Sequence, residues 1–178
     1  GTQCALLEKR FNCADLSVGD LLRAEADKPE STWAKILQEN LRTGRVGTKE
    51  MTGGIMKGAV DELVVKGVQT IILDGFPQKL ETTEYFEEFV KPFACVLVLE
   101  CPVEVLQKRL LERRRADDDA ETIVKRVDVY NQTTAVVLDK YKAAGKLVRV
   151  DADAEVVKVA AEIKRVLEAS GVRLEARQ

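Results

Sequence analysis

The sequence predicts an α/β fold, with a parallel sheet flanked by helices. Two runs, 69–74 and 94–100, contain mostly β-branched or aliphatic residues without polar alternation, which is typical of strands buried on both faces. Segments with the 3.6-residue period of helices separate these runs. Strands that alternate with helices favour a parallel sheet with right-handed crossovers.

Two further strands are predicted at 14–16 and 147–151. Helices are predicted at 31–43 and 48–66, each with a capping hydroxyl before it (Ser31, Thr48) and a glycine after it (Gly44, Gly67). These two helices follow each other without a strand between them, so we expect a small lobe beside the sheet. Later helices are predicted at 103–113, 120–143 and 154–168, and the tail 170–178 has no apolar period and is expected to fray.

The composition excludes several kinds of chemistry. A chain of 178 residues fits one domain, and 46% hydrophobic residues are enough for a packed core. The absence of histidine excludes Ser-His-Asp and Cys-His catalysis and the HExxH zinc site. Any catalysis must therefore depend on carboxylates, Lys, Arg, hydroxyls or Cys.

Charge and hydropathy limit the partners and the compartment. A net charge of −2 argues against nucleic acid as a partner, because phosphate binding on that scale needs clustered positive charge. No apolar run approaches the ~20 residues of a membrane-spanning helix, so no membrane partner is expected. The four cysteines form no CxxC pair and lie in apolar stretches. We expect reduced, buried thiols in a cytoplasmic protein.

Three segments carry candidate functional residues. Asp74 ends a predicted strand and precedes Gly-Phe-Pro, where a carboxylate could hold magnesium or simply begin an Asp-Gly turn. Residues 16–23 join a short strand to a helix start, which is either an anion site with Arg23 or an ordinary capped helix. Residues 113–119 hold three arginines and three aspartates, with Arg126 beyond them, and could be only a solvated face.

Taken together and in this order, the motifs resemble those of the adenylate kinase family of nucleoside monophosphate kinases. The matching segments are GTQC at 1–4, LSVGDLLRAE at 16–25, ILDGFP at 72–77, QKRLLER at 107–113 and DDDAET at 117–122. The resemblance implies a three-layered, P-loop NTPase type of fold in a single domain over 1–178. It also implies a small helical monophosphate-binding lobe at about 17–67 and a short lid at about 113–120. Gly1 and Thr2 would end the phosphate-binding loop, so a first, central strand and most of the loop are expected upstream.

The resemblance implies transfer of the γ-phosphoryl group of ATP to AMP, with Mg²⁺ as cofactor and a monomeric protein. ATP-binding residues would be Gly1, Thr2, Arg113 and Ala154. Residues for the monophosphate would be Ser17, Arg23, Val46, Gly75, Gln78, Thr82, Arg115 and Arg126. Arg113, Arg115 and Arg126 would be the catalytic residues, and Asp74 would hold the metal through water. Guanidinium groups suit these roles because their planar fork pairs with two phosphate oxygens at once.

The sequence departs from the family mainly in the acceptor half. Gln78 stands where the family has an arginine that contacts the acceptor phosphate, and Thr82 where adenylate kinases have Gln and pyrimidine kinases Asn. Gly47-Thr48 replaces the usual Val-Pro, Val18 replaces Thr or Ala, and the lid is shorter. Three hypotheses remain open: an adenylate kinase, a UMP/CMP kinase of the same family, and a weakened kinase-like module that binds nucleotide or belongs to an assembly.

Overall fold

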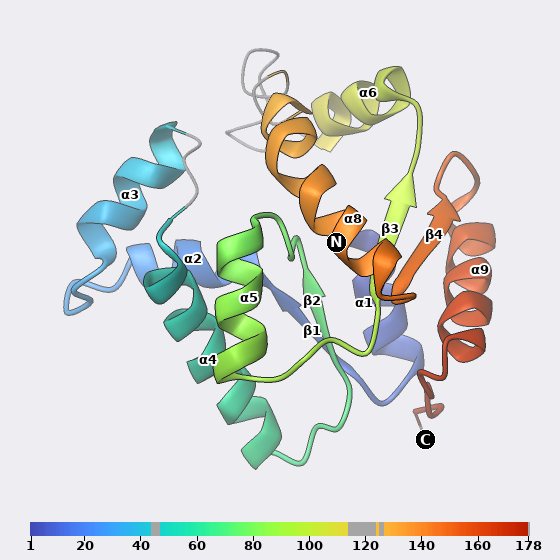
Figure 1. Ribbon diagram of the computed structural model, residues 1–178, viewed down its shortest axis with the longest axis horizontal. Coiled ribbons are helices and arrows are strands. Elements are labelled where there is room, and N and C mark those ends of the chain that lie inside the picture. Colours follow the sequence, from blue (N-terminus) through green and yellow to red (C-terminus); the bar gives the residue numbers. More distant parts are fainter. Residues whose placement is uncertain (44–46, 114–123, 125–126, 178) are drawn as a thin grey trace. The chain divides into compact units, whose positions relative to one another are not determined.

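The structure is a computed structural model that describes residues 1–43, 47–113, 124 and 127–177. The chain divides into two compact units, Gly1–Phe93 with Arg173–Gln178, and Ala94–Val172. Each unit combines parallel strands with helices (Figure 1), so the predicted α/β class is confirmed. None of the described helices has the length and apolar character needed to cross a membrane.

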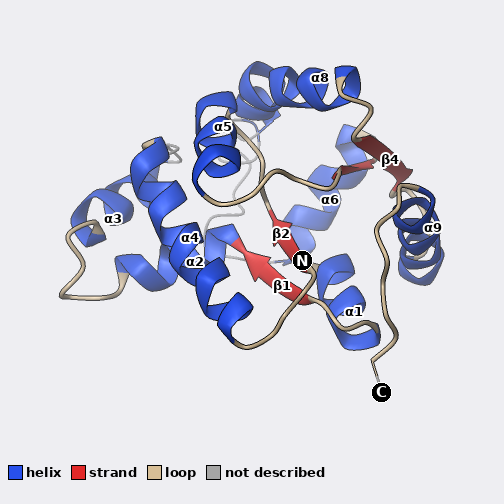
Figure 2. Cartoon of the chain, turned by 60° about the horizontal axis from the view of Figure 1, so that its bottom comes forward, coloured by secondary structure: helices blue, strands red, loops and turns tan. Residues whose placement is uncertain are grey.

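The first unit contains two parallel strands and five helices among its described residues. These are α1 (Thr2–Arg10), β1 (Ala14–Ser17), α2 (Val18–Ala26), α3 (Ala34–Thr43), α4 (Lys49–Val65), β2 (Ile71–Asp74) and α5 (Leu80–Phe89). The two strands pair in register from Ala14 opposite Ile71 to Ser17 opposite Asp74. Helix α3 packs against α2 and lies away from the strand pair (Figure 2).

Capping residues fix where two helices of this unit begin. Ser17 Oγ accepts a hydrogen bond from the backbone N–H of Asp20 at 3.3 Å, and Thr48 Oγ1 accepts one from Met51 N–H at 3.3 Å. The predicted start at Ser31 is wrong by a few residues, because Ser31 Oγ accepts from Trp33 N–H in a turn and α3 begins only at Ala34. The glycine stop at Gly67 is confirmed by its φ of +80°, whereas Gly44 lies outside the described residues.

The core of the first unit joins its helices in two clusters. Ala26, Leu37 and Met51 are buried together and connect α2, α3 and α4. Val18, Met56 and Phe86 form the second cluster, in which Phe86 stacks on Phe93 with ring centroids 5.3 Å apart. The two predicted lobe helices thus share their core with α2, α5 and β2.

The second unit also contains a parallel strand pair. Its described elements are β3 (Val96–Glu100), α6 (Val103–Arg113), η1 (Tyr130–Thr134), α8 (Ala135–Ala143), β4 (Leu147–Asp151) and α9 (Val156–Ala169). The strands pair from Val96 opposite Leu147 to Glu100 opposite Asp151. Helix α9 packs on β4 through a buried stripe of Val159, Ala160, Ile163 and Leu167, as its periodicity predicts.

Within the described residues, β1 pairs with β2 and β3 with β4, and both pairs are parallel, as predicted. The structure also corrects one expectation, which concerns the tail. The tail is not frayed over 175–177, because Glu175 accepts a hydrogen bond from Asn12 N–H at 2.8 Å and Arg177 N–H donates to the Arg10 carbonyl at 3.0 Å.

The contact between α4 and α5 predicts opposite effects for two neighbouring glycines. A Cβ at Gly53 would lie 2.5 Å from the ring of Tyr85, whereas one at Gly54 would meet nothing within 4 Å. Gly53→Ala should therefore lower the free energy of unfolding by about 1–3 kcal/mol. Gly54→Ala should raise it by about 0.5–1 kcal/mol, because alanine has the higher helix propensity.

Urea unfolding of the two variants beside the wild type measures this difference, and Gly54→Ala controls for the change in propensity. Equal effects of the two substitutions would show that α4 and α5 do not approach closely at Gly53.

Candidate active site

The register of β1 and β2 brings two of the predicted functional segments to one edge. Ser17 ends β1 directly opposite Asp74, which ends β2. Helix α2 begins after Ser17, and the loop 75–79 begins after Asp74. The carboxyl ends of parallel strands are where open α/β sheets bind ligands. This edge of the first unit is therefore the candidate active site.

The first turn of α2 offers an anion site. Its leading N–H groups have no intrahelical partner, and Ser17 Oγ satisfies one of them. The Arg23 guanidinium forms an ion pair with the Asp20 carboxylate, and both side chains are exposed. A Cβ at Gly19 would lie 3.3 Å from Arg23 Nη2, so Arg23 folds back over the helix start. A phosphate at this position would meet both the amides and the guanidinium.

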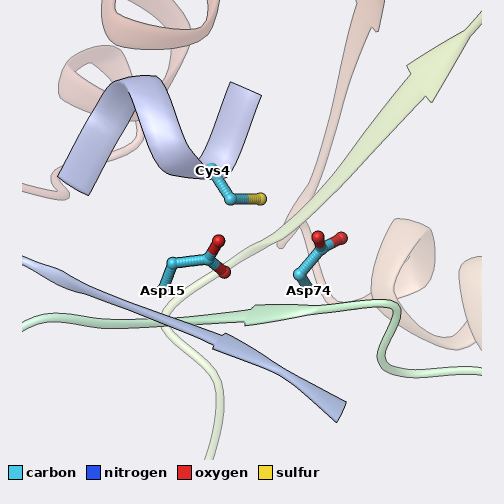
Figure 3. Close-up of side chains that lie close together, drawn as sticks. All are labelled: Cys4, Asp15 and Asp74. Atoms are coloured by element: carbon cyan, nitrogen blue, oxygen red, sulfur yellow. The ribbon is translucent and has the colours of Figure 1, made fainter. Parts of the chain in front are cut away.

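Three side chains meet beside the strand ends. The ligand atoms of Cys4, Asp15 and Asp74 lie within 4.8 Å of one another, and all three side chains point toward a common space (Figure 3). The backbone nitrogen of Gly1 lies beside the Asp74 carboxylate and 3.9 Å from Asp15 Oδ2. Gly1 and Asp74, two of the predicted site residues, thus lie together.

The donor atoms of this cluster suit a hard cation. Burial raises the pKa of the Cys4 thiol above its usual 9.0, so the sulfur stays protonated near neutral pH and is a poor ligand. Burial also raises the pKa of Asp15, so its charged form gains from a nearby cation. Two carboxylates with oxygen donors fit Mg²⁺.

Asp15 is a candidate site residue that sequence reasoning missed. Its side chain is 16% exposed, and Oδ1 is buried without a hydrogen-bond partner within the described part of the chain. The available signal was a carboxylate inside the otherwise apolar strand 14–16, since a charge there is costly unless it has a function or a partner.

The loop after β2 is closed by Gln78. Gly75 adopts a φ of +77°, and the Phe76–Pro77 peptide bond is cis. Gln78 Nε2 donates a hydrogen bond to the Gly75 carbonyl at 2.7 Å, so the amide binds its own loop. The neighbouring Lys79 ammonium forms an ion pair with Glu81, which lowers the pKa of that carboxyl. The loop therefore presents a neutral amide at the position where the family has arginine.

The other predicted residues are placed as follows. Thr82 is 2% exposed in α5, and its hydroxyl has no partner among the described residues. Thr2 opens α1 and is exposed. Ala154 is exposed in the second unit, between β4 and α9, where Arg109 Nη1 donates to the Ala152 carbonyl at 2.8 Å. Val46, Arg115, Arg126 and the side chain of Arg113 lie outside the described residues.

A capped helix start, a carboxylate pair and a Gly-Phe-Pro loop lie at one edge of a parallel strand pair, the arrangement of an α/β protein that binds its ligand at the strand ends. The sequence matches the adenylate kinase family over residues 1–146. It is 36% identical to adenylate kinase 1 of Schistosoma mansoni, over 97% of this chain and 89% of the relative. The chain belongs to the adenylate kinase family.

Relatives with other names are similarly close. A uridylate kinase of Saccharomyces cerevisiae is 31% identical over 92% of this chain and 82% of its own length. The human UMP-CMP kinase is 29% identical over 96% of this chain and 92% of its own length. Similarity to relatives therefore leaves the acceptor base open.

The cap on α2 yields a stability prediction. Ser17→Ala removes the side-chain acceptor for Asp20 N–H and should lower the free energy of unfolding by about 1 kcal/mol. Ser17→Thr retains a hydroxyl and should recover most of the loss. Thermal and urea unfolding of both variants measure the effect. If Ser17→Ala were as stable as the wild type, the hydroxyl would not cap the helix.

Proposed function

We propose that the protein transfers the γ-phosphoryl group of Mg-ATP to AMP, giving two molecules of ADP. The observation that carries this proposal is the pairing of Ser17 with Asp74, because it sets the start of α2 beside the carboxylate cluster. Phosphoryl transfer needs an anion site and a metal site close together, and no strong base. AMP is favoured by the 36% identity to an adenylate kinase, and UMP or CMP is the alternative acceptor.

The acceptor phosphate would bind at the start of α2. Arg23 would exchange its ion pair with Asp20 for a charge-assisted pair with phosphate oxygens. The free N–H groups of the first turn would add hydrogen bonds and the positive end of the helix dipole. Gln78 contributes no charge, so Arg23 carries more of the phosphate binding than it would in a relative with arginine at that position.

The donor side would depend on the carboxylate cluster and on residues implied by the family resemblance. Asp74, with Asp15 beside it, would hold Mg²⁺, which when bound neutralises charge on the phosphate oxygens of ATP. Gly1 and Thr2 would contact the ATP phosphates, and Ala154 would also contact ATP. Arg113, Arg115 and Arg126 would stabilise the transferring phosphoryl group. Exclusion of water by lobe and lid would prevent simple hydrolysis of ATP.

We further propose a cytoplasmic, monomeric protein. All four cysteines are free, and three of them, Cys4, Cys13 and Cys95, have pKa values raised by burial. Protonated, partly covered thiols react slowly and are typical of reducing compartments.

Restoring arginine in the loop should strengthen acceptor binding. Gln78→Arg should lower the KM for the monophosphate by roughly tenfold to a hundredfold, because one charge-assisted bond to phosphate is added. The KM for ATP should not change. Initial rates with AMP, UMP and CMP at saturating Mg-ATP measure both values and identify the preferred acceptor.

Gln78→Met is the matched control, since it removes the bond to the Gly75 carbonyl without adding charge. It should not lower the KM. A wild type with ordinary acceptor affinity that Gln78→Arg does not improve would show that another cation already fills this role. If neither the wild type nor Gln78→Arg transfers the phosphoryl group, the hypothesis of a weakened, kinase-like nucleotide-binding module is favoured.

Removing the charge of Asp74 should impair the use of magnesium. Asp74→Asn should reduce kcat at least tenfold, or about 1.4 kcal/mol, and raise the Mg²⁺ concentration needed for half-maximal rate. Asp61→Asn, in an exposed ion pair with Lys57 on α4, is the control and should leave both values unchanged. An unchanged Mg²⁺ dependence in Asp74→Asn would place the metal elsewhere.

A further inference from the structure

The tail over 175–177 pairs with the segment that joins α1 to β1. Asn12 N–H donates a hydrogen bond to the Glu175 carbonyl at 2.8 Å. Arg177 N–H donates one to the Arg10 carbonyl at 3.0 Å, and an antiparallel bridge lies between these two bonds. The tail belongs to the first unit, although it follows α9 in the sequence. Its hydrogen bonds fix it in one register beside the end of α1 (Figure 2).

Arg177 also caps α1 with its side chain. Nη1 of the guanidinium donates a hydrogen bond to the Glu8 carbonyl at 3.0 Å. The last four carbonyls of a helix have no partner within the helix, and α1 ends at Arg10. Arg177 therefore supplies partners for two of these groups, one through its backbone N–H and one through its side chain. Its positive charge also lies at the negative end of the helix dipole, which is favourable.

Helix α1 has few other anchors in the described part of the chain. Leu7 is the one residue of the helix that is buried. The Glu8 carboxylate accepts a hydrogen bond from Asp15 N–H at 3.2 Å, which ties the helix to β1. Glu8 is thus held on both sides, by β1 through its side chain and by Arg177 through its carbonyl. A helix that buries so little depends on such polar ties for its placement.

The other end of α1 lies at the candidate active site. Gly1 and Thr2 begin the helix. The Cys4 thiol lies within 4.8 Å of carboxylate oxygens of Asp15 and Asp74 (Figure 3). The helix has 9 residues, which at about 1.5 Å each make it about 13 Å long. Because so short a helix moves as one unit, a displacement at its end also displaces its start.

We propose that the tail positions α1 for the phosphates of ATP, with Arg177 as the positioning residue. This inference rests on the proposed function, in which Gly1 and Thr2 contact those phosphates. Arg177 acts through the helix, from the end opposite to the phosphates. A small displacement of phosphate-binding groups weakens binding, even when the altered residue is distant. The family match covers residues 1–146 and does not include the tail.

Arg177→Ala tests the role of the cap. The Kd for Mg-ATP, measured by calorimetry without an acceptor, should rise about three- to tenfold, because the phosphate-binding end of α1 is less well placed. The KM for the monophosphate should not change, since α2 and the loop 75–79 form the acceptor half. Arg177→Lys keeps the charge and an N–H donor, so it should recover most of the affinity for Mg-ATP.

Hydrogen exchange reports on the helix itself. In Arg177→Ala the amide hydrogens of α1 should exchange about three- to tenfold faster, whereas those of α4 and α5 should keep their rates. Arg173→Ala is the matched control, because it removes the same charge from the same segment. The Arg173 side chain has no hydrogen bond or ion pair within the described residues. The control should leave the Kd for Mg-ATP and the exchange of α1 unchanged.

Two results would overturn the inference. An Arg177→Ala protein with faster exchange in α1 but an unchanged Kd for Mg-ATP would show a merely structural cap. Equal effects of Arg177→Ala and Arg173→Ala would show that the loss of charge alone explains them. If Arg177→Ala fails to fold, Arg177→Gln, which loses the charge but keeps an N–H donor, should still raise the Kd about twofold. An unchanged Kd in Arg177→Gln would then overturn the inference.

The binding measurement separates this inference from the proposed function. A wild type that binds Mg-ATP but transfers no phosphoryl group contradicts the proposed function, whereas weaker binding by Arg177→Ala still supports the inference. A wild type that transfers the group, with Arg177→Ala binding Mg-ATP equally well, contradicts only the inference. A wild type that does not bind Mg-ATP contradicts both.

Discussion

The parallel register of β1 and β2 is the constraint on which the candidate site depends. It sets Ser17 opposite Asp74, so that the capped start of α2 and the Asp74 carboxylate lie at the same edge of the strand pair. A slip of one residue would turn every side chain of a strand to its other face. Asp15 would then leave Cys4 and Asp74, and the carboxylate pair would be lost.

Among the described residues, the loop after β2 presents no unpaired cation to an acceptor phosphate. Gln78 binds the Gly75 carbonyl, and Lys79 is engaged with Glu81. Arg23, the remaining described cation of the predicted acceptor residues, shares its charge with Asp20. Each of these pairs is exposed, so solvent screening keeps it weak and a doubly charged phosphate can compete for Arg23.

Local patterns predicted most of the elements, and contacts distant in sequence account for what they missed. The aliphatic run before Asp74 and the Thr48 cap have local causes, and β2 and α4 lie where expected. The Ser31 cap failed because its hydroxyl closes a turn before α3. The order of 175–177 depends on hydrogen bonds to residues 10 and 12, which no local pattern contains. The cluster around Asp15 was missed for the same reason, because only the strand register brings Cys4 and Asp74 to it.

The central claim is that this edge of the first unit passes a phosphoryl group between two nucleotides. It is tested most directly by incubating the protein with ATP labelled in its γ-phosphate, Mg²⁺ and AMP, and separating the products. We expect the label in the β-phosphate of ADP, with little released as inorganic phosphate, because the reaction excludes water. Label that stays in ATP with every monophosphate offered, or that appears only as inorganic phosphate, would contradict the claim.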